Sequence, residues 1–275
     1  MSGILYVVGT PIGNLGDFSP RAVQTLENVD FIAAEDTRVT VKLLNHFGIK
    51  KPMVSYFEHN KIERGDVICK RILNGENCAI VTDAGMPAIS DPGEELVRQC
   101  KEFGIKTESV PGPSAVITAL SLCALPTGRF TFEGFLSMNK KSRKEHLEDI
   151  KTQTRTMVFY EAPHKLSNTL KDLYNALGER DLAIVREITK IHEEVIHTTL
   201  SSAVSLYSNN TLKGEIVLVI DGAKKPDAEV FTLEQAVQIA KDNIASGMSA
   251  SDACKNASKF TNIKKGDIYK ELSSK

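Results

Sequence analysis

Two short runs of charged residues follow apolar segments and have side chains suited to proton transfer or charge stabilisation. The first is Glu35-Asp36-Thr37-Arg38, and the second is Arg186-Glu187-Ile188-Thr189-Lys190. Carboxylates can accept a proton, and cations can stabilise a developing negative charge. Taken alone, the first run is better explained as a salt-bridged helix start and the second as a solvated strand end.

Three glycine- and proline-rich loops, each directly after an apolar run, are more unusual. They are Gly9–Asn14, Thr82–Gly93 and Pro111–Ala115. Glycine lets a ligand approach the backbone closely. The first loop matches neither GxGxxG nor GxxxxGK[ST], which disfavours a Rossmann dinucleotide site and a P-loop. We favour a ligand site over a simple turn for the second loop, and we interpret Asp91 and Ser114 as caps of the following helices.

The elements that position these loops alternate between strand and helix. Residues 1–125 are expected to form an N-terminal α/β domain, with strands at Ile4–Val8, Phe31–Ala34, Ala79–Val81 and Lys106–Val110. This alternation predicts a largely parallel, doubly wound sheet. In such sheets ligands bind in a crevice at the carboxyl ends of the strands.

The rest of the chain changes character after a Leu-Pro-Thr-Gly linker. Residues 126–224 are expected to form a second α/β domain with mixed strand pairing. Residues 230–275 are expected to form a small lysine-rich helical domain. The sequence therefore predicts an α/β protein of two α/β domains plus a helical C-terminal domain.

Composition excludes several classes of protein. The 275 residues carry a formal net charge of -1, so no global basic field indicates nucleic acid. The five cysteines are scattered, which disfavours a disulfide framework and a metal site and fits a cytoplasmic protein. We expect neither a signal peptide nor a membrane span.

A local basic segment remains as a candidate for phosphate binding. It contains Lys140, Lys141, Arg143 and Lys144. Acidic residues follow directly, so a solvated loop or helix start explains the segment about equally well.

Taken together and in order, nine motifs resemble the tetrapyrrole methylase superfamily, and its ribosomal RNA branch most closely. They are TPIGNLGDFSPRAVQTL, AEDTR, YFEHN, TDAGMPAISDPG, PGPSAVITAL, FEGFL, FYEAPHK, REITK and KGE, spanning about residues 3–222. The C-terminal segment is similar to the helix-turn-helix-like tail of the same branch. Met86 is a departure, because the family usually has Thr there.

The resemblance implies S-adenosylmethionine held in the cleft between the two α/β domains, largely by backbone, in a homodimer. Carried onto this sequence, it points to these cofactor-binding residues: Pro11, Asp83, Ala84, Gly85, Ala88, Ile89, Ser114, Ala115, Tyr160, Glu161, Gly214 and Glu215.

The resemblance also implies 2′-O-methylation of a cytidine ribose in small-subunit ribosomal RNA. We expect Lys190 or Arg38 to stabilise the reacting oxygen, and Glu187 or Asp36 to orient groups or accept a proton. Lys140, Lys141, Arg143, Lys144 and the tail are expected to bind the RNA of the small ribosomal subunit. A C-methyltransferase acting on a tetrapyrrole and a non-enzymatic nucleic-acid-binding protein are the alternatives.

Overall fold

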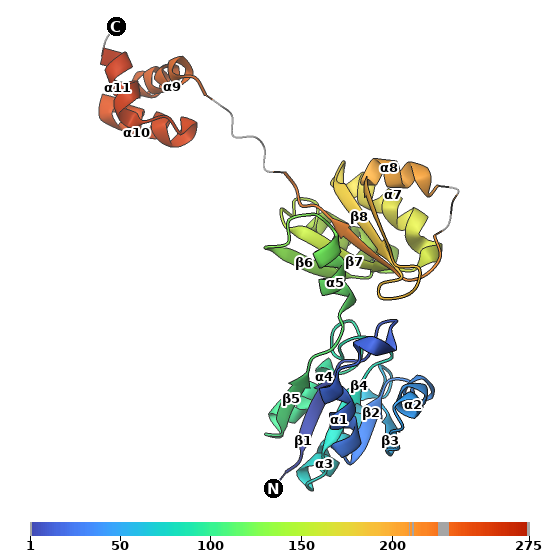
Figure 1. Ribbon diagram of the computed structural model, residues 1–275. Helices are drawn as coiled ribbons and strands as arrows, with labels where there is room; N and C mark the ends of the chain where they lie inside the picture. The colour runs from blue at the N-terminus through green and yellow to red at the C-terminus, as the bar shows by residue number, and fades with distance from the viewer. Residues whose placement is uncertain (1, 209, 211, 225–230, 274–275) are drawn as a thin grey trace. The chain divides into compact units, whose positions relative to one another are not determined.

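The structure is a computed structural model that describes residues 2–208, 210, 212–224 and 231–273. The chain divides into two compact units, Met1–Ala223 and Lys224–Lys275 (Figure 1). The first unit contains two five-stranded sheets. No helix in the described ranges is long and apolar enough to cross a membrane.

The first sheet is parallel throughout and has the strand order β3-β2-β4-β1-β5. Its strands are β1 (Ile4–Val8), β2 (Phe31–Ala34), β3 (Met53–Ser55), β4 (Cys78–Val81) and β5 (Lys106–Val110). The flanking helices are α1 (Pro20–Asn28), α2 (Thr37–His46), α3 (Lys61–Leu73) and α4 (Glu94–Glu102).

Each face of the first sheet buries a separate apolar cluster. Leu26 of α1 and Leu44 of α2 pack with Ile32 on one face. Ile68 of α3 and Leu96 of α4 lie in the cluster of the other face. Helices therefore cover both faces, and the predicted doubly wound parallel sheet is confirmed.

Local capping explains where some of these helices begin. The Ser19 hydroxyl accepts a hydrogen bond from the Ala22 N–H, with Pro20 in the first turn of α1. The Asp36 carboxylate caps α2 by accepting from the Arg38 N–H at 2.8 Å. The charged run after β2 is therefore a helix start, as its isolated pattern indicated.

Two of our predicted caps are wrong. Helix α4 begins at Glu94, so Gly93 is its N-cap residue and Asp91 lies two residues too early to cap the helix. Ser114 does occupy the N-cap of α5 (Ala115–Leu122), but its hydroxyl makes no capping hydrogen bond. The side chains of both residues are thereby left for another role.

The second sheet has the order β6-β7-β10-β8-β9 and mixed pairing, as predicted. Only β6 and β7 pair in parallel, while the other three pairs are antiparallel. Its strands are β6 (Phe130–Gly134), β7 (Thr156–Glu161), β8 (Asp181–Arg186), β9 (Glu194–Thr199) and β10 (Ile216–Ile220).

Helices cover both faces of the second sheet, and one of them, α5, also connects it to the first sheet. One face packs against α6 (Lys140–Asp149), α7 (Leu166–Leu177) and α8 (Leu200–Leu206), and the short helix η2 (Pro163–Lys165) directly precedes α7. On the other face, Val116 and Leu120 of α5 lie in one cluster with Val217. Because α5 directly follows β5 of the first sheet, it joins the two sheets (Figure 1). The domain boundary at residue 125 stays a prediction.

Within the described residues 231–273, the second unit forms three short helices around a small core. They are α9 (Leu233–Ala245), α10 (Ala250–Thr261) and α11 (Lys265–Ser273). Ala240, Cys254 and Ile268 are fully buried at their junction. Thr232 and Gln235 form a reciprocal capping box at the start of α9. The helical C-terminal unit that the sequence predicts is therefore present.

Candidate functional site

A cavity in the first unit, called the larger cavity below, lies where loops after strands of both sheets meet. Its volume is about 580 Å³. Eight of the residues we predicted to bind a cofactor line it, from the loops of the first sheet and from β7 and the start of β10: Ala84, Gly85, Ile89, Ser114, Ala115, Tyr160, Glu161 and Glu215. The structure thus gathers most of the predicted cofactor residues around one space.

The other four predicted cofactor residues lie elsewhere. Pro11 and Asp83 line a smaller cavity. Ala88 and Gly214 line neither cavity. A Cβ on Gly214 would overlap the Glu187 side chain, so this glycine makes room for a neighbouring carboxylate.

Several lining residues were not among our predicted site residues. They are Ile12, Met86, Ser90, Asp91, Ile117, Phe135, Ala162, Pro163, Ile188, Ile216 and Val217. Met86, Ser90 and Asp91 belong to the second loop, which the sequence favoured as a ligand site without ranking them individually. The others are apolar, and their residue types alone do not separate them from ordinary core residues. Ala162 and Pro163 lie within the motif FYEAPHK and Ile188 within REITK, so these motifs were the available signals for them.

The walls of the larger cavity are fixed by direct contacts between the three loops. A Cβ on Gly9 would lie 2.7 Å from the Gly112 Cα, so the first and third loops touch through their backbones. Thr10 and Gly85 exchange backbone hydrogen bonds at 2.9 and 3.2 Å. The Thr10 hydroxyl also donates to the Thr82 carbonyl at 3.0 Å. These hydrogen bonds pair the backbone of the first loop with the backbone of the second.

A half-buried carboxyl group lies on the larger cavity, where our cap prediction had placed only a helix start. Burial raises the pKa of Asp91 to about 6, and the nearby carboxylates of Glu35 and Asp83 raise it further in the same direction. Burial also raises the pKa of Glu35 and of Asp83. Asp91 therefore brings a carboxylate to the wall of the larger cavity at neutral pH, near Glu35 and Asp83, and this favours a cationic ligand.

An ion pair between Arg38 and Asp36 lies next to Asp83. The Arg38 guanidinium contacts the Asp36 carboxylate at 2.7 Å, and the hydrogen bonds from Arg38 hold the pKa of Asp36 at about 2. The Asp36 N–H donates to the Asp83 carboxylate at 3.3 Å. The Arg38 side chain is 87% exposed, so it is available to a ligand that approaches from solvent.

Lys190 lies in a compact network in the second charged run. Its Nζ contacts the carboxylates of Glu187 and Glu215, both at 3.0 Å. Burial lowers the pKa of Lys190, but the bonds to these carboxylates outweigh it and leave the pKa raised. Hydrogen bonds from Lys190 and from the Glu215 N–H lower the pKa of Glu187. Lys190 is thus a cation at neutral pH and Glu187 an ionised carboxylate.

This network also contacts the first loop. A Cβ on Gly13 would lie 2.6 Å from the Lys190 Cγ and 3.0 Å from the Ile188 carbonyl oxygen. Gly13 lines the smaller cavity, whereas Ile188 and Glu215 line the larger one. Lys190 is therefore placed next to both cavities.

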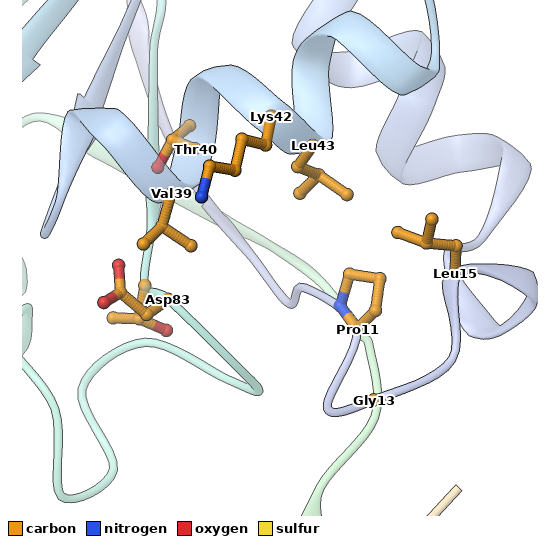
Figure 2. A pocket seen from close by; sticks show the side chains of 9 residues that line it. Pro11, Gly13, Leu15, Val39, Thr40, Lys42, Leu43 and Asp83 are labelled. Carbon is orange, nitrogen blue, oxygen red and sulfur yellow. The ribbon is translucent and has the colours of Figure 1, made fainter. Parts of the chain in front are cut away.

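The smaller cavity lies between the first loop, η1 (Leu15–Asp17) and helix α2, and its volume is about 290 Å³ (Figure 2). Pro11 and Leu15 lie on one side, and Val39 and Lys42 of α2 lie on the other (Figure 2). Asp83 also lines the smaller cavity, whereas the nearby Asp91 lines the larger one. Each cavity thus has a carboxyl group in its wall, and the carboxylate of Asp83 raises the pKa of Asp91.

The predicted RNA-binding segment forms the first half of α6. Lys140, Lys141 and Lys144 are exposed. Arg143 turns inward instead, because its guanidinium contacts the Asp172 carboxylate at 2.7 Å and the Thr169 hydroxyl at 2.9 Å. Three cations of this segment thus remain accessible, and Arg143 is engaged within the protein.

No group of three or more His, Cys, Asp or Glu side chains suited to a metal ion occurs among the residues that the structure describes. All five cysteines are free and buried.

Sequence comparison identifies relatives along nearly the whole chain. Residues 4–204 match the sequence profile of the tetrapyrrole (corrin/porphyrin) methylases. A Synechocystis protein named ribosomal RNA small subunit methyltransferase I is 46% identical over 97% of this chain and 96% of its own. A Bacillus subtilis protein of the same name is 41% identical over 97% of this chain and 93% of its own.

Solved structures share the fold of the first unit at low sequence identity. Uroporphyrin-III C-methyltransferase from Thermus thermophilus superposes with a TM-score of 0.56 at 18% identity, covering 80% of this chain and 94% of its own. A cobalt precorrin-4 methyltransferase gives a TM-score of 0.58 at 19% identity, covering 78% of this chain and 94% of its own.

Proposed function

Because this chain belongs to the tetrapyrrole (corrin/porphyrin) methylase family, we propose that it methylates small-subunit ribosomal RNA with S-adenosylmethionine as donor. The observation that carries this proposal is the match to relatives named ribosomal RNA small subunit methyltransferase I, which covers 97% of the chain. The match therefore includes most of the helical second unit. Neither a tetrapyrrole acceptor nor a non-enzymatic role has comparable support.

The larger cavity fits the proposed cofactor. Its volume of about 580 Å³ lies within the range of roughly 300–1,000 Å³ that is usual for small-molecule sites. Ile12, Met86 and Val217 offer apolar surface for a flat base, and Asp91 offers negative charge. When bound there, S-adenosylmethionine supplies a methyl group on a positively charged sulfur for in-line displacement.

The acceptor we propose is the 2′-hydroxyl of a cytidine. A ribose hydroxyl is a weak nucleophile, so a nearby cation that stabilises the forming oxyanion lowers the barrier. Lys190 is such a cation, and Glu187 holds its ammonium in place. Arg38 and Asp36 are the second candidates for the same two roles, as an ion pair at the start of α2.

The proposed function also concerns where the protein acts and whether it forms a dimer. The free, buried cysteines are consistent with a reducing cytoplasm, where ribosomal subunits are assembled. The homodimer implied by the family resemblance stays a prediction, and measuring the mass of the protein in solution tests it.

Methyl transfer from labelled S-adenosylmethionine to undermethylated small ribosomal subunits tests the proposal directly. Label is expected in RNA, at the ribose of one cytidine. Label on a tetrapyrrole given in parallel, with none on RNA, would support the C-methyltransferase alternative. Calorimetry that detects no binding of S-adenosylmethionine would instead support the non-enzymatic one.

The raised pKa of Asp91 predicts a pH-dependent affinity for the cofactor, which carries net positive charge. Above pH 6 the carboxylate is ionised and attracts the ligand, so affinity is expected to fall as the pH decreases through 6. The expected loss is up to about tenfold per pH unit, because a cation bound beside the carboxylate lowers the pKa of that group.

Asp91→Asn should remove this pH dependence and weaken binding at pH 8, as measured by calorimetry between pH 5 and pH 8. Asp66→Asn on α3, an exposed position outside both cavities, is the matched control and should bind as the wild type does. An unchanged pH profile in Asp91→Asn would show that Asp91 does not face the ligand.

The second unit is expected to contribute RNA affinity through its lysines. Lys241, Lys255 and Lys259 are exposed on α9 and α10. Deleting residues 229–275 should weaken RNA binding and reduce its dependence on salt, because each lost phosphate contact lowers the salt slope by about 0.7–0.9. Since Met1–Ala223 is a compact unit, its affinity for S-adenosylmethionine should persist. An unchanged salt slope would reject this role.

A further inference from the structure

The larger cavity opens to solvent between apolar side chains. Ile89, Ile117 and Phe135 line this cavity, yet they are 54%, 57% and 57% exposed. A side chain that both lines a cavity and reaches solvent lies where the cavity opens. Exposed apolar side chains gathered around one opening are typical of a ligand-binding surface. Phe135 is the aromatic member of this group, and it has no role in the site described so far.

The backbone just before Phe135 departs from a regular strand. The register of β6 on β7 shifts by one residue between Phe132 and Gly134, which is the mark of a β-bulge. Gly134 then has a φ of 64°, a left-handed conformation that favours glycine. A Cβ on Gly134 would lie 3.8 Å from the Ser90 Oγ, so this turn faces the second loop of the first sheet. Bulges are common beside functional sites, where they redirect a side chain, and here the redirected residue is Phe135.

Two further rings support Phe135. Its ring centroid lies 5.5 Å from that of Tyr160, which in turn lies 5.1 Å from that of Phe132. Tyr160 and Phe132 pack against the apolar cluster that α5 shares with the second sheet. Phe135 is therefore the outermost of three rings, fixed on one side by the core and open to solvent on the other. A supported ring of this kind offers a flat surface for stacking at little cost in conformational entropy.

The exposed cations of α6 follow Phe135 closely in the chain. Lys140 is five residues after Phe135, a stretch that spans at most about 18 Å. Lys140, Lys141 and Lys144 are exposed, and the pair of Lys141 with Glu145 is loose, at 3.9 Å between two exposed side chains. A supported ring beside several cations matches single-stranded nucleic acid, whose bases stack on aromatic side chains while its phosphates contact lysines.

From these observations we propose that Phe135 stacks on a base of single-stranded RNA at the mouth of the larger cavity, while the exposed lysines of α6 contact the phosphates beside that base. This inference rests on the proposed function and places the acceptor strand on the same cavity as the methyl donor. Glu215, which the Lys190 ammonium contacts, lines this cavity as well. Donor, acceptor strand and the proposed oxyanion-stabilising cation therefore meet at one space.

Phe135→Leu tests the proposal, because leucine keeps an apolar side chain and removes the ring. Its affinity for a short single-stranded oligocytidine RNA is expected to fall about tenfold, with the salt slope unchanged, since stacking involves no phosphate. Phe135→Tyr keeps a ring and should bind as the wild type does. Lys144→Gln should instead lower the salt slope by about 0.7. Fluorescence anisotropy at several salt concentrations, with saturating S-adenosylhomocysteine to fill the cofactor site, measures these effects.

Phe103→Leu is the matched control for the loss of an exposed ring. Phe103 is 49% exposed at the end of α4 and lines neither cavity, so this variant should bind oligocytidine as the wild type does.

Methyl transfer to small ribosomal subunits, measured in parallel, separates this inference from the proposed function. Weaker oligocytidine binding by Phe135→Leu, with no methylation by the wild type, would support the stacking surface and reject the function. Normal methylation by the wild type with equal oligocytidine affinity in Phe135→Leu would overturn the surface alone. Two other results would also overturn it. Phe135→Leu could lose affinity only for S-adenosylmethionine, which would assign the ring to the cofactor, or it could halve the mass of the protein in solution, which would assign the surface to a second copy of the chain.

Discussion

Lys190→Ala is expected to lower the rate of methyl transfer by about 100- to 1,000-fold, the usual effect of losing one group that stabilises an oxyanion. Lys190 is the cation that contacts the border of both cavities, and its bonds to Glu187 and Glu215 keep it protonated. The affinity for S-adenosylmethionine should change only a few-fold. Single-turnover rates and calorimetry on the same samples measure the two effects.

Matched variants make this prediction specific. Lys190→Arg keeps the charge and should retain part of the rate. Lys106→Ala removes another Lys–Glu pair, the one to Glu108 on β5. Lys106 begins this strand, at the opposite end from the loop that lines the larger cavity, so the rate should be unchanged. If Arg38→Ala loses the rate instead, then Arg38 is the stabilising cation. Full activity in both Lys190→Ala and Arg38→Ala would reject both assignments.

The architecture was largely predictable because it depends on short apolar runs and on turn residues. Phe31–Ala34 is a fully buried strand, Ile4–Val8 is a strand that is only partly buried, and Ser19-Pro20 begins a helix as expected. The Thr82–Gly93 loop was also recognisable, because it is long, rich in glycine and proline, and carries few charged residues. Eight predicted cofactor residues consequently line one cavity.

The remaining site residues depend on tertiary neighbours that local patterns do not reveal. Asp91 matched a capping box in sequence, yet the helix begins at Glu94 and leaves the carboxyl group on the cavity. Arg143 resembled its basic neighbours, but α7 provides Asp172 and Thr169 as partners.

Filling the larger cavity is expected to have the second large effect. Ala115 is the first residue of α5 and lines the cavity, so the ring of Ala115→Phe would take space that the cofactor needs. We expect the affinity for S-adenosylmethionine to fall at least about 100-fold, which corresponds to roughly 2.7 kcal/mol. Calorimetry measures this loss, and the Tm without cofactor should stay close to that of the wild type.

Ala115→Ser controls for the position itself, because serine adds little volume, and it should bind the cofactor nearly as the wild type does. Affinity for RNA should survive in Ala115→Phe, because the exposed lysines of α6 and of the second unit are unchanged. Loss of cofactor binding with RNA binding retained would separate the two sites within one protein. Wild-type cofactor affinity in Ala115→Phe would instead mean that the methyl donor binds outside the larger cavity.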